Sequence, residues 1–338
     1  MNRIAMLGLV LAVSVLPGLR LACAPGGDGG ADTLTIGAYS VIREALHEGI
    51  LPAFADQWRR TTGREVRFEE SYNASGAQAR AIASGFDADV ALLSLESDVD
   101  LLVRAGLVRA DWKTGPHGGM ITRSLVVIGH RPGNPRKIHA WEDLARPGIG
   151  VLYPDPKTSG GARWNVNALY GAGLRQGGRA AARDLLARVQ ANVVTMDASG
   201  RQSMATFERG TGDAIITYEN ELLLQRKLKG EAAPYVVPPA TLLIEGPAAI
   251  VEASVKRHGN RRLAEAFLAF LRAPAGQRIL MDYGFRPLDP TLDARPLPPE
   301  LFTMKDLGGW SRINNEIYKP GGVWDSLFLG PKGGKGRL

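Results

Sequence analysis

The 338-residue sequence contains few of the residues that metal sites and nucleophilic enzymes depend on. It has one cysteine, Cys23, and five dispersed histidines with no H-x-H or H-x-x-x-H spacing. One cysteine excludes a disulfide scaffold and a cysteine-based metal cluster, and histidines without ligand spacing are typical of structural or exposed positions. The G-x-S-x-G, S-x-x-K and P-loop motifs are also missing from the sequence. We therefore expect no metal and no cofactor.

The sequence also lacks a transmembrane-length apolar run near its start and a strong charge of one sign. The apolar run at residues 4–16 is too short to span a bilayer. The 41 basic and 34 acidic residues are interleaved, apart from a short basic tail near Lys332. A nucleic-acid-binding protein usually has a clustered basic stripe, so no nucleic-acid partner is expected. With 45% hydrophobic and 22% charged residues, the composition is that of a soluble globular protein, and the length favours two domains.

The first residues form an export signal. The apolar run follows Arg3 and is broken by Pro17-Gly18, as in a signal peptide, which we place at residues 1–24. Two processing alternatives remain open: lipidation of Cys23, or cleavage after Ala24. We favour the lipoprotein-like junction, because residues 25–31 form a glycine-rich linker that suits an anchored domain. Both alternatives place the protein in the periplasm or at the extracytoplasmic membrane surface, with membrane attachment only through a lipid anchor.

Strand-like and helix-like patterns alternate along the rest of the chain. Apolar runs predict strands at residues 34–39, 65–71, 89–95, 124–130, 149–153, 213–218 and 242–251. Helical periodicity marks residues 46–58, 75–84, 162–174, 181–191, the region around 222–224, and 263–271. Such alternation predicts an α/β fold with parallel strands covered by helices.

Two lobes, joined by crossovers near residues 123–130 and 241–251, account most simply for this order of elements. Lobe 1 comprises residues 32–122 and 245–328, including a C-terminal helical tail. Lobe 2 comprises residues 123–244. The basic, glycine-rich tail at residues 329–338 is expected to be disordered.

Three turns share one design, in which a strand is followed by a serine–glycine turn and then a helix. They are Ser75-Gly76, Ser159-Gly160-Gly161 and Ser199-Gly200. Each places free backbone N–H groups and a serine hydroxyl at a helix N-terminus, which suits an oxyanion. The alternative is helix capping, because Gln78 and Gln202 complete capping boxes. The glycine pair at 160–161 favours a ligand, since two glycines weaken a helix start unless something approaches the backbone closely.

Around these turns the sequence resembles the periplasmic sulfate-binding proteins of ABC importers and their thiosulfate-binding relatives. The matching segments are AYSVIRE (38–44), SYNASGAQA (71–79), KTSGGARWN (157–165), FERGTGD (207–213), ENE (219–221), LFT (301–303), GGW (308–310) and GG (321–322). They cover nearly all of the chain after the leader, and KTSGGARWN is the most specific. The resemblance implies a two-lobed periplasmic binding protein fold of type II. In that fold each lobe is a mainly parallel sheet flanked by helices, and the ligand lies in the cleft.

The resemblance also implies a set of ligand-binding positions. They are Ser75, Ser159, Gly160, Gly161, Gly200 and Tyr218. Tyr218 stands where the family has a tryptophan; an indole only donates a hydrogen bond, whereas a phenol can also accept one. Arg163 and Arg201 are expected to orient the loops behind the ligand. No catalytic residue is implied, and the protein is expected not to be an enzyme.

The expected function is to capture sulfate, or thiosulfate, between the lobes and to deliver it to an ABC permease as a monomer. Sulfate carries no proton at neutral pH, so a cradle of donors satisfies it, and none of the three turns contains an acidic residue. Two alternatives stay open. One is an extracytoplasmic oxyanion sensor. The other is a serine-dependent ester hydrolase using Ser75 or Ser159, although no histidine base lies near either serine in the sequence.

Overall fold

The protein is described by a computed structural model that covers residues 31–327. The predicted signal peptide, the junction at Cys23, the linker as far as residue 30 and the tail at 329–338 lie outside the described residues. Among the helices of residues 31–327, none combines the length and the apolar character that crossing a membrane requires.

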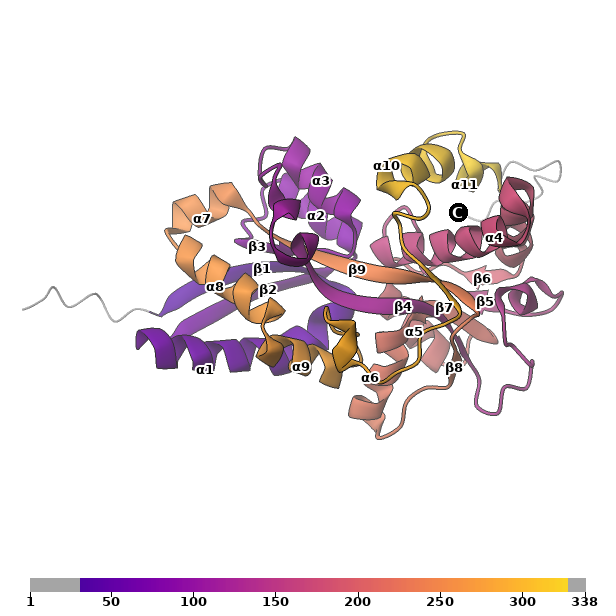
Figure 1. Ribbon diagram of the computed structural model, residues 1–338, viewed down its shortest axis with the longest axis horizontal. Helices are drawn as coiled ribbons and strands as arrows, with labels where there is room; N and C mark the ends of the chain where they lie inside the picture. The colour runs from indigo at the N-terminus through magenta and orange to yellow at the C-terminus, as the bar shows by residue number, and fades with distance from the viewer. Residues whose placement is uncertain (1–30, 328–338) are drawn as a thin grey trace, which may run out of the picture. The chain divides into compact units, whose positions relative to one another are not determined.

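The described residues contain a 10-stranded sheet in the order β2-β1-β3-β9-β4-β7-β5-β6, with β10 paired to β9 and β8 paired to β4 (Figure 1). The strands are β1 (Asp32–Tyr39), β2 (Val66–Asn73), β3 (Val90–Leu92), β4 (Met120–His130), β5 (Val151–Leu152), β6 (Val193–Thr195), β7 (Ala214–Tyr218), β8 (Tyr235–Val236), β9 (Ala240–Ile250) and β10 (Glu300–Phe302). β1 pairs in parallel with β2 and β3, and β5 pairs in parallel with β6 and β7. The sheet therefore has two parallel groups of strands.

The long strands β4 and β9 join these two groups. β4 and β9 are antiparallel to each other. β4 is also antiparallel to β7, and β9 is antiparallel to β3. Arg123 on β4 lies opposite Glu245 on β9, and the two side chains form an ion pair of 3.1 Å. The predicted lobe boundaries, between 122 and 123 and between 244 and 245, thus face each other across this pair. The assignment of residues to two lobes stays a prediction.

Helices cover both faces of the sheet. They are α1 (Leu51–Thr62), α2 (Ser75–Ala83), α3 (Glu96–Arg104), α4 (Gly160–Ala191), α5 (Gly200–Glu208), α6 (Glu219–Lys229), α7 (Glu252–His258), α8 (Arg261–Arg272), α9 (Pro274–Asp282), α10 (Gly309–Ile313) and α11 (Val323–Ser326). Figure 1 shows α1, α8 and α9 on one side of β1–β3, with α2 and α3 on the other. Near β5–β7, α4 and α10 lie on the same side as α2 and α3.

Local sequence explains where most of these helices begin and end. Leu46, Ile50, Phe54 and Trp58 are all buried, and their helix starts as a π-helical turn (Ala45–Ile50) before α1. Gly63 ends it in the left-handed conformation, with φ of 71°, which glycine adopts without strain. The helices predicted at 162–174 and 181–191 form α4, which is interrupted at residues 177–178, where the backbone is not helical.

Candidate functional site

The helices that follow the parallel strands begin where the carboxyl ends of the two groups of strands face each other. α2 follows β2, α3 follows β3, α4 follows β5, α5 follows β6 and α6 follows β7. β1–β3 and β5–β7 run in opposite directions from opposite ends of the β4–β9 pair, so their carboxyl ends point toward each other. The N-termini of these helices therefore gather between the two groups, with their free N–H groups and the positive ends of their dipoles. The three serine–glycine turns are the starts of α2, α4 and α5, as the sequence predicted.

Ser75 is the first residue of α2 and is buried at 3% exposure. Its hydroxyl donates to Asp98 Oδ2 at 2.5 Å and accepts from the backbone N–H of Ser94 at 2.9 Å. The capping-box interpretation is wrong here, because Ala74 occupies the N-cap and the Gln78 side chain accepts from Asn73 instead. The Ser75 hydroxyl is therefore engaged within the protein, which leaves its backbone N–H for a ligand.

Asp98, on α3, was not singled out from the sequence. Burial raises the pKa of its carboxyl group, and the hydrogen bond from Ser75 opposes that rise. The sequence offers one indication of its position: Asp98 comes three residues after the strand predicted at 89–95, and so near the end of that strand. Its carboxyl group belongs to the site only because folding places it against Ser75, 23 residues away in the chain.

The Ser159 turn starts α4 beside Ser75. The Ser159 hydroxyl caps the helix by accepting from the Ala162 N–H at 3.4 Å. A Cβ on Gly160 would lie 3.0 Å from Ser75 Cβ and 3.1 Å from Ser94 Cβ, so protein atoms make the close approach at this glycine. The nearest neighbours of a Cβ on Gly161 outside its own helix backbone would be Ser159 Oγ at 3.3 Å and the Tyr218 ring and hydroxyl at 3.6 and 3.7 Å. Gly160 serves packing, whereas Gly161 faces two hydroxyl groups.

Tyr218 ends β7 and is 3% exposed. Its hydroxyl lies 2.6 Å from the hydroxyl of Ser94, which comes two residues after the end of β3. Trp164 of α4 donates from its indole nitrogen to the Ser94 carbonyl at 2.9 Å. Burial raises the pKa of Tyr218 well above its ordinary value, so the phenol stays neutral. Ser94 and Trp164 are members of the site that sequence reasoning missed, although Trp164 lies within the KTSGGARWN motif.

The Ser199 turn is connected to the Ser159 turn by a hydrogen bond between the residues that precede the two serines. Ser199 caps α5 by accepting from the Gln202 N–H at 3.3 Å, and Thr158 donates to the Ala198 carbonyl at 2.9 Å, which ties the second turn to the third. A Cβ on Gly200 would lie 3.3 Å from Val41, near the end of β1.

Arg201 lies between two carboxylates. Its Nη2 is 2.6 Å from Glu44 Oε2 and 3.1 Å from Glu221 Oε1. The Glu221 side chain is fully buried; this burial raises its pKa to about 7, and the charge of Arg201 opposes the rise. Arg163 donates to the Pro156 carbonyl at 3.1 Å and lies 5.0 Å above the Tyr318 ring. Both arginines contact protein groups near the turns, and their role in orienting the loops stays a prediction.

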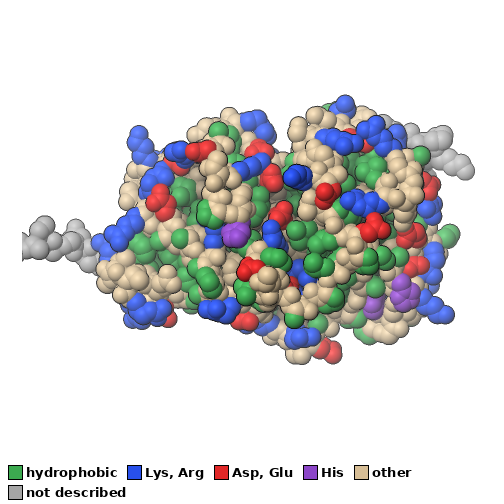
Figure 2. Space-filling view, viewed as in Figure 1, with side chains coloured by type: hydrophobic (Ala, Val, Ile, Leu, Met, Phe, Trp, Pro, Cys, Tyr) green, Lys and Arg blue, Asp and Glu red, His purple; other side chains and the backbone are tan. Residues whose placement is uncertain are grey.

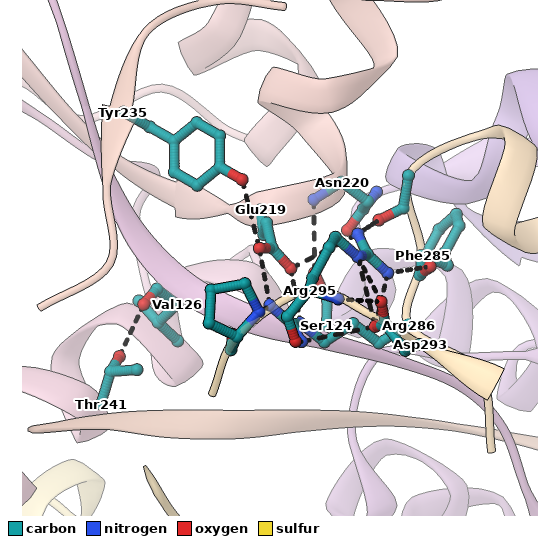
Figure 3. Close-up of polar contacts among 12 residues, drawn as sticks. Ser124, Val126, Glu219, Asn220, Tyr235, Thr241, Phe285, Arg286, Asp293 and Arg295 are labelled. Atoms are coloured by element: carbon teal, nitrogen blue, oxygen red, sulfur yellow. Dashed lines mark hydrogen bonds and ion pairs between the residues drawn. The ribbon is translucent and has the colours of Figure 1, made fainter. Parts of the chain in front are cut away.

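A buried ion-pair network holds the start of α6, one residue after Tyr218 (Figure 3). Arg286 binds Glu219 through two hydrogen bonds of 2.7 and 2.9 Å, and the two side chains are only 5% and 1% exposed. Asp293 pairs with Arg286 at 3.3 Å and with Arg295 at 2.9 Å. The network links α6 to the segment after α9, and it thereby supports the turn that carries Tyr218.

The site holds hydrogen-bond donors rather than catalytic groups. In residues 31–327, no three His, Cys, Asp or Glu side chains are grouped as a metal site would need. Neither the Ser75 nor the Ser159 hydroxyl is hydrogen-bonded to a histidine or lysine among the described contacts. Helix N-termini and buried hydroxyls can bind an oxyanion without a paired cation. Figure 2 shows the surface hollowed between the part over α2 and α3 and the part over α10, with Lys and Arg side chains on both rims.

Comparison with known proteins agrees with this geometry. Residues 34–286 match a family model described as bacterial extracellular solute-binding protein. The chain belongs to this family. It is 40% identical to the sulfate-binding protein of Synechococcus elongatus, over 89% of this chain and 88% of that protein. It is also 33% identical to the thiosulfate-binding protein of Escherichia coli, over 88% of this chain and 91% of that protein.

A solved structure extends the likeness to three dimensions. The sulfate-binding protein SubI from Mycobacterium tuberculosis H37Rv is 36% identical, has a TM-score of 0.78, and is matched over 85% of this chain and 100% of that chain. The predicted family and the predicted α/β periplasmic binding protein fold are thereby confirmed.

Proposed function

We propose that this member of the family captures sulfate and presents it to the permease of an ABC importer. The observation that carries the proposal is the meeting of the α2 and α4 N-termini around Gly160 and Gly161, with the hydroxyls of Ser159 and Tyr218 beside them. Relatives at 33–40% identity are named for binding sulfate or thiosulfate, which supports a substrate-binding role in an importer. Thiosulfate is the second ligand we expect.

In this proposal, backbone N–H groups and two hydroxyls surround the anion. The amides come from Ser75, Gly160, Gly161 and Gly200, and the hydroxyls from Ser159 and Tyr218. Each donates, and sulfate at neutral pH has only acceptors, so every contact is a charge-assisted hydrogen bond. The Ser75 hydroxyl is left out, because it already donates to Asp98.

The relatives are named as binding proteins, and the chain is a binding protein rather than an enzyme. The hydrolase alternative is not favoured, since the relatives are named as binding proteins and neither the Ser75 nor the Ser159 hydroxyl contacts a histidine or lysine among the described contacts. The sensor alternative is not favoured either, since the relatives are named for binding their ligands.

Calorimetric titration tests the proposal directly. Sulfate and thiosulfate should bind to the purified protein, with phosphate and molybdate as matched tetrahedral controls that bind more weakly. Saturating sulfate should also raise the melting temperature by mass action. A protein that binds none of the four anions, or that is stabilised only by nucleotides or metal ions, would overturn the assignment.

We also propose export with a lipid anchor on Cys23, and a monomeric protein. Labelled palmitate should enter the full-length protein in cells, and Cys23→Ser should abolish the label while leaving sulfate binding intact. Unlabelled wild-type protein recovered free in the periplasm would instead show cleavage after Ala24. Size-exclusion chromatography with light scattering checks the monomer.

A further inference from the structure

Ser94, in the bend after β3, and Tyr218, at the end of β7, form a buried hydroxyl pair. The oxygens lie 2.6 Å apart, although the residues are 124 positions apart in the chain. Ser94 is 2% exposed and Tyr218 is 3% exposed. Because water has little access to either group, their hydrogens need acceptors within the protein or its ligand.

Whichever hydroxyl donates, one hydrogen of this pair is left without an acceptor among the described contacts. The Trp164 indole can only donate, and its Nε1 lies 3.2 Å from Ser94 Oγ as well as 2.9 Å from the Ser94 carbonyl. Trp164 therefore approaches Ser94 Oγ as a donor. The other described contact of that oxygen is with Tyr218. If Tyr218 donated to Ser94, the Ser94 hydrogen would lack an acceptor among the described contacts. If Ser94 donates, the Tyr218 hydrogen lacks one instead, and the phenol oxygen lies beside Gly161, where the anion is proposed to bind.

We propose that Ser94 is a positioning residue, which donates to Tyr218 and so turns the phenol hydrogen toward the bound oxyanion. Tyr218 Oη would be 3.7 Å from a Cβ on Gly161, which places it at the start of α4, where the anion is proposed to bind. Hydrogen bonds in series strengthen one another, so a Trp164–Ser94–Tyr218 chain makes the phenol a better donor to an anion. The inference rests on the proposed function and names a residue that acts through Tyr218.

Ser94→Ala is a clean test because it removes only one oxygen. The backbone contacts of residue 94 with Ser75 and with Trp164 do not involve the side chain, and its Cβ against Gly160 stays in place. Ser94→Ala, Tyr218→Phe and the double variant form a double-mutant cycle. Each protein is titrated with sulfate at pH 7 in a calorimeter, and urea denaturation without sulfate checks that each is folded.

Ser94→Ala should weaken sulfate binding about three- to tenfold, the size of a neutral hydrogen bond. Tyr218→Phe should weaken it about ten- to hundredfold, as for a hydrogen bond to a charged group. The double variant should bind no more weakly than Tyr218→Phe, because Ser94 has nothing to orient without the phenol. A purely structural role for Ser94 would not produce this coupling.

The possible failures are distinguishable. Unchanged affinity in Ser94→Ala, or losses that multiply in the double variant, overturns the positioning role while leaving the sulfate assignment standing. A wild-type protein that binds no oxyanion overturns the proposed function, and this inference with it.

Discussion

Replacing Gly161 with alanine adds one methyl group between the hydroxyls of Ser159 and Tyr218. That methyl carbon would lie 3.3 Å from Ser159 Oγ and 3.6–3.7 Å from the Tyr218 ring and hydroxyl, with no backbone atom among the three nearest contacts. A small movement of the Ser159 side chain relieves the shortest contact. The methyl group also takes up space at the start of α4, where we place the anion.

The fold and the ligand should therefore respond in opposite directions. Alanine is a better helix former than glycine by about 0.5–1 kcal/mol, so the free energy of unfolding without sulfate should be unchanged or higher by up to about 1 kcal/mol. Sulfate affinity should fall about ten- to hundredfold, because the methyl group crowds the anion away from one of its donors, and a charge-assisted hydrogen bond contributes about 1.5–3 kcal/mol.

Gly160→Ala is the matched control one residue earlier. Its Cβ would lie 3.0–3.1 Å from Leu95, Ser75 and Ser94, so overpacking should lower the unfolding free energy by about 1–3 kcal/mol. Urea denaturation measures stability for both variants, and calorimetry measures sulfate binding. If Gly161→Ala binds sulfate as tightly as the wild type, the turn is an ordinary helix start and the anion lies elsewhere.

Three further predictions test neighbouring groups. Ser159→Ala should lose about 1.5–3 kcal/mol of sulfate binding by calorimetry but only about 1 kcal/mol of stability; unchanged affinity with reduced stability would identify a plain N-cap. Burial raises the pKa of Glu221 from 4.5 to about 7, so its folded form binds the extra proton. The difference in unfolding free energy between the wild type and Glu221→Gln, measured in urea, should favour the wild type most below pH 4.5. It should fall by about 3 kcal/mol as the pH rises from 4.5 to 7, whereas parallel pH profiles would contradict the burial argument. Arg286→Leu should cost about 3–5 kcal/mol in urea denaturation by leaving Glu219 buried without its partner; a loss below 1 kcal/mol would mean that the network is dispensable.

Much of the fold follows from local patterns that can be recognised in the sequence. The stripe of Leu46, Ile50, Phe54 and Trp58 is buried because its spacing matches one face of a helix, whatever packs against it. Ser159 and Ser199 cap helices because a hydroxyl accepts from N–H groups two or three residues ahead. The KTSGGARWN segment indicates the family, because the residues of that motif are contiguous in the chain.

Only the tertiary structure decided which side chains of the site are hydrogen-bonded to each other. The sequence shows that Ser75 begins a helix, but its hydroxyl points to Asp98, which comes from another helix. Likewise, Ser94 meets Tyr218 only because β9 and β4 bring the two parallel groups of strands into one sheet. The raised pKa of Glu221 has the same origin, since desolvation depends on every element that packs around a group. Helix starts and strands are set by interactions over a few residues. Hydrogen-bond partners and burial are set by contacts between segments that are distant in the chain, such as Ser94 and Tyr218, 124 residues apart, or Glu44 and Arg201, 157 residues apart.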